Sequence, residues 1–372
     1  MSPATVRESL TVELDIHPDC ADFHTDEGHQ RTLAVGTYEL DETTQIRNGK
    51  LYTYRVEGNC DDGAQVSSSS PNTASLSLQL EHAVVDLPGI FDMHFAPISG
   101  TNVVLALADG SIRMIDVCTG SESASTGASP AMALTVDTLG ASPTSGISSG
   151  SPKIAASYSD GSIKIFDVTP DGGLVQLEGL DWGAHSLEAW MATWSREPSR
   201  RGNVVYSGGD DAIFQAWDLR ESNGSNGSNQ PARLFVDRKT HGAGVTCVGE
   251  LGGEHTVMTG SYDNNLRIWD WRNSMKPVVE ASLDLGGGVW RLKPKPDDPT
   301  VVLAATMYDG FKLLRLKRDG AVWIEHLADF PTQRTDKTLA YGASWCQEPG
   351  LNGLAATCSF YDNLLSLWNI SL

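Results

Sequence analysis

Short segments with alternating apolar and polar residues recur along the chain, and residues 259–272 give the clearest copy. Leu266 and Ile268 fall on one face of a strand with a two-residue period, and Trp269 falls on the other face. A run of small residues precedes this strand. Asp263 opens the turn between the two, where a carboxylate can accept backbone N–H bonds. The segment therefore predicts a two-stranded hairpin that ends in Trp-Asp.

This hairpin pattern occurs six times, each time with an aspartate at the turn. The turn aspartates are Asp109, Asp160, Asp211, Asp263, Asp309 and Asp362. A weaker copy precedes them at residues 33–38 and 49–55. A period of about 50 residues with four short strands and Trp-Asp endings is typical of WD40 β-propellers. The sequence therefore predicts an all-β, seven-bladed WD40 β-propeller that occupies residues 1–372 as a single domain.

The two ends of the chain are expected to complete one blade together. Asn369 ends the third strand of the last repeat, and too few residues follow it to form a fourth strand. An unpaired sheet edge would promote aggregation. Residues 5–10 are therefore expected to close the ring as the missing outer strand, and residues 11–16 to form the inner strand of the first blade.

Four segments lack the alternating pattern and are rich in Ser, Gly and Asn. Such segments cannot bury enough apolar surface to offset the entropy lost on ordering. They are expected to be loops inserted between strands, and they lie near residues 58–74, 119–130, 139–152 and 221–230.

Composition and charge argue against several classes of binding partner and site. The 27 Lys and Arg residues against 47 Asp and Glu residues give a net charge of −20, which argues against binding to a nucleic-acid backbone. The six cysteines show no C-x-x-C spacing, so neither a metal site nor a disulfide framework is indicated. The sequence contains no apolar signal segment and no membrane span. We therefore expect a cytoplasmic monomer with no membrane partner.

The inner strands can be aligned on their apolar positions, and this alignment predicts a cluster of side chains at one mouth of a central channel. The aromatic members are Phe91, Trp190, Trp290 and Tyr341. The charged members are Glu13, Asp92 and Arg291. Two interpretations remain open: the cluster is a reactive site, or the aromatic rings only fill the hub while Arg291 pairs with Asp92.

Two histidines each precede an inner strand by four residues. In WD40 repeats, this is the position of a histidine that binds a strand hydroxyl, the turn aspartate and the tryptophan of the same blade. The sequence predicts two such sets, which are His185 with Ser207, Asp211 and Trp217, and His241 with Ser261, Asp263 and Trp269. A structural role is favoured over a catalytic one, because a buried histidine needs partners.

Several longer segments resemble one family of WD40 proteins, the diphthine methyl ester hydrolases of diphthamide biosynthesis. The most specific are Gly-Gly-Val-Trp-Arg at residues 287–291 and Cys-Ser-Phe-Tyr-Asp at residues 358–362. The likeness is strong in the C-terminal half and limited in the first three blades to residues 36–38 and the overall layout. Other segments that carry it are residues 207–220, 259–273 and 341–345.

The resemblance implies a reaction and a protein substrate. Members of the family remove a methyl ester from an intermediate built on a histidine of translation elongation factor 2, which frees a carboxylate for amidation. The substrate also carries a trimethylammonium group, which aromatic faces bind by cation–π attraction. No cofactor is implied. The family supplies no established catalytic residues to carry over.

Roles for the channel residues follow from what ester hydrolysis requires. Asp92 or Glu13 would act as the base, and Arg291 would hold the oxyanion or the product carboxylate. The four aromatic residues of the cluster would form the cage for the trimethylammonium group. The alternative function is a non-catalytic scaffold for protein assembly, because fold alone does not assign an activity to a WD40 propeller.

Overall fold

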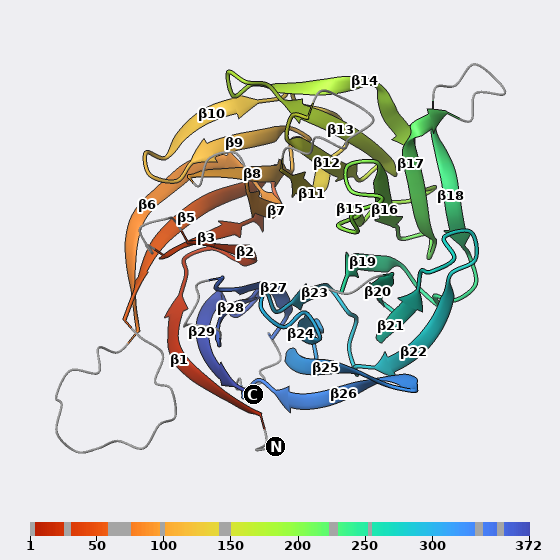
Figure 1. Ribbon diagram of the computed structural model, residues 1–372. Coiled ribbons are helices and arrows are strands. Elements are labelled where there is room, and N and C mark those ends of the chain that lie inside the picture. The colour runs from red at the N-terminus through yellow and green to blue at the C-terminus, as the bar shows by residue number, and fades with distance from the viewer. Residues whose placement is uncertain are drawn as a thin grey trace.

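Seven twisted antiparallel sheets are arranged in a ring around a central axis, which confirms the predicted seven-bladed propeller (Figure 1). The computed structural model describes residues 4–25, 31–58, 76–96, 101–140, 150–222, 230–251, 255–331, 338–347 and 353–372. Most of the predicted loop segments at residues 58–74, 139–152 and 221–230 fall outside this part of the chain.

Each blade has an inner strand next to the axis and a second strand paired with it. The inner strands are β2 (Pro18–Thr25), β7 (Ile90–Phe95), β11 (Ala133–Leu139), β15 (Met191–Trp194), β19 (Val245–Glu250), β23 (Arg291–Pro294) and β27 (Ala340–Trp345). The second strands are β3 (Arg31–Thr37), β8 (Asn102–Leu107), β12 (Lys153–Tyr158), β16 (Val204–Gly208), β20 (Thr256–Ser261), β24 (Val301–Ala305) and β28 (Leu354–Ser359).

Two further strands complete each blade toward the outside. The third strands are β5 (Arg47–Glu57), β9 (Ile112–Asp116), β13 (Ser162–Val168), β17 (Phe214–Ser222), β21 (Asn265–Asp270), β25 (Phe311–Asp319) and β29 (Leu364–Ser371). The outer strands are β6 (Ser77–Pro88), β10 (Ser121–Ser125), β14 (Leu174–Gly183), β18 (Pro231–Asp237), β22 (Val278–Asp284), β26 (Ala321–Asp329) and β1 (Thr5–Glu13). A short strand, β4 (Glu39–Leu40), also pairs with β5.

The turn aspartates share one backbone geometry. The residue that follows each of them has a positive φ, and these residues are Gly110, Gly161, Ala212, Asn264, Gly310 and Asn363. Glycine and asparagine adopt this left-handed conformation readily, whereas Ala212, with φ of 60°, does so at a cost. The aspartate-led turn therefore fixes the register between the second and third strands of these six blades.

The small-residue strands allow neighbouring blades to pack closely. A Cβ atom at Gly260 of β20 would lie 2.6 Å from the Cγ1 atom of Val289 in the next blade. Glycine at this position removes the clash and lets the two blades approach. Within the described ranges, seven clusters of buried apolar side chains lie between neighbouring blades, so the main core there is distributed around the ring rather than at its centre.

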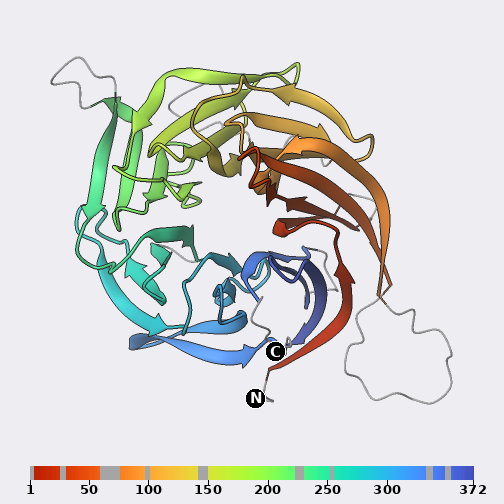
Figure 2. The ribbon, with the colours of Figure 1, turned by 180° about the vertical axis from the view of Figure 1, so that it is seen from behind.

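The N-terminal strand closes the ring, as predicted. β1 pairs with β29 in antiparallel register from Thr5 opposite Ser371 to Glu13 opposite Leu364. The two views of the ribbon place β1 alongside β29, with the two chain ends close together (Figure 1, Figure 2). The outer position of the last blade is therefore filled by the opposite end of the chain.

The structure corrects three expectations about strand boundaries. The inner strand of the first blade is β2, and not residues 11–16, because β1 continues through Glu13 on the outer edge. The inner strand of the third blade, which the alignment of inner strands predicts to begin at Ala131, begins at Ala133. Residues 119–130 are not entirely loop, since Ser121–Ser125 form the outer strand β10 against β9.

Candidate functional site

A cavity of about 190 Å³ lies at one mouth of the central channel, where the inner strands begin. Five of the seven residues predicted to cluster there line it together. They are Phe91, Trp190, Trp290, Arg291 and Tyr341. Six further residues complete the lining, namely Asp19, Tyr38, Arg47, Met132, Leu134 and Tyr262. The cavity thus combines a mainly aromatic wall with two cationic groups and one carboxylate.

The aromatic rings form a nearly continuous chain of contacts around the cavity. The Trp290 ring stacks on Tyr341 with centroids 4.9 Å apart, and Trp190 meets Trp290 edge-on at 5.6 Å. Tyr262 contacts both tryptophan rings at 6.0 Å. Phe360 links Tyr341 to Tyr38, and Tyr38 contacts Phe91 at 4.9 Å. A wall of this kind suits a cation that carries apolar substituents.

Arg291 and Asp92 lie next to each other below the aromatic wall. Nη2 of Arg291 is 3.8 Å from Oδ1 of Asp92, and both side chains are buried. Oδ2 of Asp92 accepts a hydrogen bond from the Val136 backbone N–H at 3.2 Å. Asp92 contacts Arg291 but is not among the residues that line the cavity. This pairing agrees with the interpretation in which Arg291 pairs with Asp92 and the aromatic rings fill the hub.

Asp19 is the carboxylate that lines the cavity itself. It lies on β2, is 3% exposed, and its Oδ2 atom has no hydrogen-bond partner among the described residues. Burial raises the pKa of the Asp19 carboxyl well above its usual value, Arg291 acts in the opposite direction, and Asp92 raises it further. The positive charge of Arg291 lowers this pKa by less than burial raises it.

The two tryptophans of the wall differ in how their indole N–H groups are used. Nε1 of Trp190 donates to Oδ1 of Asp210 at 2.9 Å. Nε1 of Trp290 is buried and has no acceptor among the described residues. The guanidinium of Arg291 lies over the Trp290 ring, with Cζ 4.8 Å from its centroid. Trp290 therefore already carries a cation at its ring and retains an unused donor.

Glu13 does not belong to this site, so the expectation that it lies in the channel is wrong. It is exposed at the end of β1, on the outer edge of the last blade. The inner strand of the first blade begins later, at Pro18. Asp19 therefore takes the place in the channel that was expected for a residue between positions 11 and 16. The apolar pattern of residues 10–16 resembles an inner strand, and this resemblance caused the misplacement.

Among the lining residues that the sequence did not predict, Tyr262 could have been recognised from its position in the repeat. It directly precedes the turn aspartate Asp263, at the end of β20. The turn between second and third strands therefore brings this position to the same mouth as the start of the inner strands. Tyr38 and Arg47 come from the irregular first blade, where β4 interrupts the repeat and no such alignment was possible.

The first predicted histidine set is present. Nδ1 of His185 lies 2.9 Å from Oδ1 of Asp211, and Nε2 lies 2.9 Å from Oγ of Ser207. Nε1 of Trp217 donates to the same hydroxyl at 3.0 Å. His185 thus connects the turn, the second strand and the third strand of the fourth blade, and these contacts account for its burial without assigning it to catalysis.

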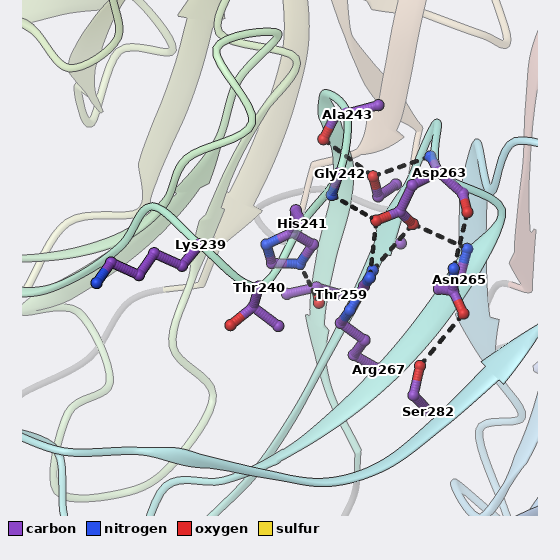
Figure 3. Close-up of polar contacts among 12 residues, drawn as sticks. Lys239, Thr240, His241, Gly242, Ala243, Thr259, Asp263, Asn265, Arg267 and Ser282 are labelled. Carbon is purple, nitrogen blue, oxygen red and sulfur yellow. Dashed lines mark hydrogen bonds and ion pairs between the residues drawn. The ribbon is translucent and has the colours of Figure 1, made fainter.

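The second set differs from the prediction (Figure 3). His241 Nε2 lies 2.9 Å from Oγ1 of Thr259, which also accepts the Trp269 indole N–H. Ser261 is not a partner, because Thr259 stands at the strand position that matches Ser207. Asp263 instead accepts both Nη groups of Arg267, at 2.9 and 2.7 Å. His241 Nδ1 has no hydrogen bond among the described residues.

A larger cavity of about 390 Å³ lies at the opposite ends of the inner strands. Its charged side chains largely face one another, with His94 beside Asp22 and Arg196 beside Asp137. In the described part of the chain, no group of three or more His, Cys, Asp or Glu side chains is arranged to hold a metal ion. No helix there is long and apolar enough to cross a membrane.

Comparisons with known proteins agree with this architecture. Residues 234–270 match the family described as WD domain, G-beta repeat. Among solved structures, a chain in the crystal structure of a mitotic checkpoint complex superposes with a TM-score of 0.68 at 14% identity, covering 99% of this chain and 93% of that one. At this identity the likeness concerns the fold.

The sequence relatives are more specific. Diphthine methyltransferase of Mus musculus is 30% identical over 92% of this chain and 70% of its own length. The Dictyostelium discoideum homologue is 28% identical over 96% of this chain and 98% of its own length. The Schizosaccharomyces pombe protein of the same name is 29% identical over 90% of each chain.

Proposed function

The chain belongs to the diphthine methyltransferase family, and on this basis we propose that it hydrolyses the methyl ester of methylated diphthine on translation elongation factor 2. The products would be methanol and the carboxylate required for the final amidation in diphthamide synthesis. The family places the chain in diphthamide biosynthesis. The direction of the chemistry and the protein substrate are our proposal.

The observation that carries the proposal is the composition of the 190 Å³ cavity. It joins an aromatic wall to Arg291 and to the buried carboxylate of Asp19. The aromatic wall suits the trimethylammonium group of the substrate, since a desolvated cation–π contact contributes about 2 kcal/mol. Arg291 suits the ester end, because a guanidinium can bind an oxyanion or a carboxylate through two N–H groups.

The charged groups of the site oppose one another, since Asp19, Arg47 and Arg291 line the cavity and Asp92 lies 3.8 Å from Arg291. Hydrolysis would create a new carboxylate beside the two aspartates, so electrostatic repulsion would favour release of the product.

The name of the family describes methyl transfer. This alternative reaction would change the mass of its substrate in the opposite direction. An ester hydrolase lowers the mass of the modified factor by one methylene group, whereas a methyltransferase raises it by the same amount. We therefore propose incubating the purified protein with methyl-esterified elongation factor 2 and measuring the mass of the modified histidine peptide. A loss of mass with release of methanol supports hydrolysis, and an unchanged mass would contradict it.

A further inference from the structure

We propose that Asp19 is the general base of the reaction and that the indole N–H of Trp290 stabilises the oxyanion. This inference rests on the proposed ester hydrolysis and assigns the chemistry within the same cavity. It differs from the roles that the sequence suggested, in which Asp92 was a base and Trp290 a binding surface for the cation.

Asp19 and Asp92 both act on the charge of Arg291, and their surroundings separate their roles. Asp92 accepts the Val136 N–H at 3.2 Å and lies 3.8 Å from Arg291, so its charge is already engaged. Asp19 lines the cavity, and its Oδ2 atom lacks any hydrogen-bond partner among the described residues although it is buried. A buried acceptor without a donor is unfavourable by about 1–3 kcal/mol. A water molecule of the reaction, bound in the cavity, would supply that donor.

Burial also makes Asp19 the stronger base. Desolvation raises the pKa of the Asp19 carboxyl well above its usual value. A raised pKa means that the ionised carboxylate holds a proton more strongly than an exposed one, so it is the stronger base towards water. The neighbouring phenols do not compete for this role, because burial raises the pKa of Tyr38, Tyr262 and Tyr341 and keeps them protonated.

Trp290 is better placed to donate a hydrogen bond than to hold the cation. Its ring stacks on Tyr341 and carries the Arg291 guanidinium at 4.8 Å. A second cation at this ring would be repelled by Arg291. Its Nε1–H is buried, lacks an acceptor among the described residues and belongs to a residue that lines the cavity. The trimethylammonium group would then contact the other aromatic residues of the wall, chiefly Trp190, Tyr262 and Phe91.

The proposed step conserves atoms and protons. The oxygen of water forms a bond to the ester carbonyl carbon while Oδ2 of Asp19 accepts one of its protons. The tetrahedral oxyanion accepts hydrogen bonds from Trp290 Nε1–H and from Arg291. When the intermediate collapses, the bond from carbon to the methoxy oxygen breaks, and Asp19 returns its proton to that oxygen to form methanol. The carboxylic acid product then loses its proton to solvent.

The experiment compares turnover with binding in three variants. Turnover is methanol release from methyl-esterified elongation factor 2, and binding is the quenching of tryptophan fluorescence by tetramethylammonium. Asp19→Asn should lower kcat at least about 100-fold, since general base catalysis contributes factors of this size. Its affinity for tetramethylammonium should stay within about threefold of wild type, a difference below 1 kcal/mol. Asp19→Glu should recover part of the lost kcat.

Trp290→Phe isolates the N–H group, because the ring and its stacking remain. It should lower kcat by about 10²-fold, as loss of one oxyanion donor does elsewhere, with little change in tetramethylammonium affinity. Glu42→Gln provides a matched control, since it makes the same acid-to-amide change at an exposed loop position. The control should retain the wild-type kcat.

The outcomes separate this inference from the proposed function. Wild-type kcat in Asp19→Asn, or in Trp290→Phe, would overturn the assigned roles and leave ester hydrolysis standing. Parallel loss of activity and of tetramethylammonium binding in Asp19→Asn would make Asp19 a counter-ion for the substrate and would also overturn the inference. If the wild-type protein releases no methanol, the proposed function fails, and the inference fails with it. Thermal melting of each variant shows whether it folds, and if Asp19→Asn does not fold, Asp19→Glu and Trp290→Phe decide.

Discussion

The guanidinium of Arg291 in the sixth blade lies 3.8 Å from the carboxylate of Asp92 in the second blade. Both groups are buried, and Asp92 is the strongest of the charges that stabilise the Arg291 guanidinium. Arg291 also lines the cavity and carries its guanidinium over Trp290. The same residue therefore contributes to the stability of the hub and to the proposed chemistry, and substitutions can separate the two contributions.

Arg291→Ala should lower the free energy of unfolding by about 3–5 kcal/mol, because it leaves a buried carboxylate without its partner. Arg291→Lys should restore much of that stability and little of kcat, since lysine lacks the planar guanidinium. Chemical denaturation and methanol release measure the two effects. Arg272→Ala, which removes an exposed partner of Asp270, is the control and should leave the stability nearly unchanged. Full activity in Arg291→Lys would exclude a two-pronged contact with the ester.

Deletion of residues 1–9 should destabilise the protein. It removes most of β1, so the hydrogen bonds to β29 from Thr5 to Glu8 are lost and the outer edge of the last blade is exposed. We expect the melting temperature to fall by several degrees and aggregation to increase. Differential scanning calorimetry of the full chain and the truncated chain checks this. Equal melting temperatures would mean that closure by β1 contributes little.

The overall fold could be predicted because its signals are local and repeated. The turn aspartates and the left-handed residues after them mark each hairpin independently, and six copies reinforce one another. The closing strand could be predicted from the incomplete last blade. The placement of β10 could not, because Ser121–Ser125 are mostly polar and exposed and show no alternating apolar pattern.

The site could be predicted in part, because side chains were assigned from strand register. Trp190, Trp290, Arg291 and Tyr341 follow inner-strand patterns that are regular, and they meet at the cavity. Asp19 was missed because its strand begins with proline and has an irregularity between Pro18 and Cys20, which hides the alternation. Because the predicted inner strand lay a few residues too early in the chain, the exposed carboxylate of Glu13 was assigned to the channel in place of the buried carboxylate of Asp19.

His241 should make stability depend on pH. Burial, and to a lesser extent the charge of Arg267, lower the pKa of His241 to about 4. The unfolded chain, with an ordinary histidine pKa near 6.5, binds the proton more tightly than the folded one. The stabilising contribution is therefore complete above about pH 6.5 and is lost progressively as the pH falls toward 4. His241→Gln should flatten the melting temperature across this window, and an unchanged pH dependence would contradict the assignment.

Ala212→Gly should preserve or increase stability. Ala212 adopts a φ of 60° at the position where three of the other five repeats have glycine. Relief of this strain is worth about 1–2 kcal/mol, and the greater freedom of glycine in the unfolded chain offsets about 0.4–1 kcal/mol of it. The converse change, Gly310→Ala, should lower stability. Urea denaturation of the two variants tests the pair, and a loss of stability in Ala212→Gly would show that the alanine methyl group makes a contact that outweighs the strain.

Trp190→Ala should weaken substrate binding more than it slows turnover. Its ring forms part of the aromatic wall, and a desolvated cation–π contact of about 2 kcal/mol corresponds to more than tenfold in affinity. The expected result is a raised KM with kcat nearly preserved. Glu13→Gln, on the outer edge of the last blade, should change neither constant. A variant of Trp190 with an unaltered KM would place the cation elsewhere.

The most direct test of the account is inhibition of wild-type methanol release by tetramethylammonium, with methyl-esterified elongation factor 2 as substrate. If the aromatic cavity at the channel mouth is the active site, the protein should release one methanol per esterified factor, and tetramethylammonium should raise the apparent KM without changing kcat. Absence of methanol would contradict ester hydrolysis. Methanol release that persists unchanged at saturating tetramethylammonium would contradict the placement of the reaction in this cavity.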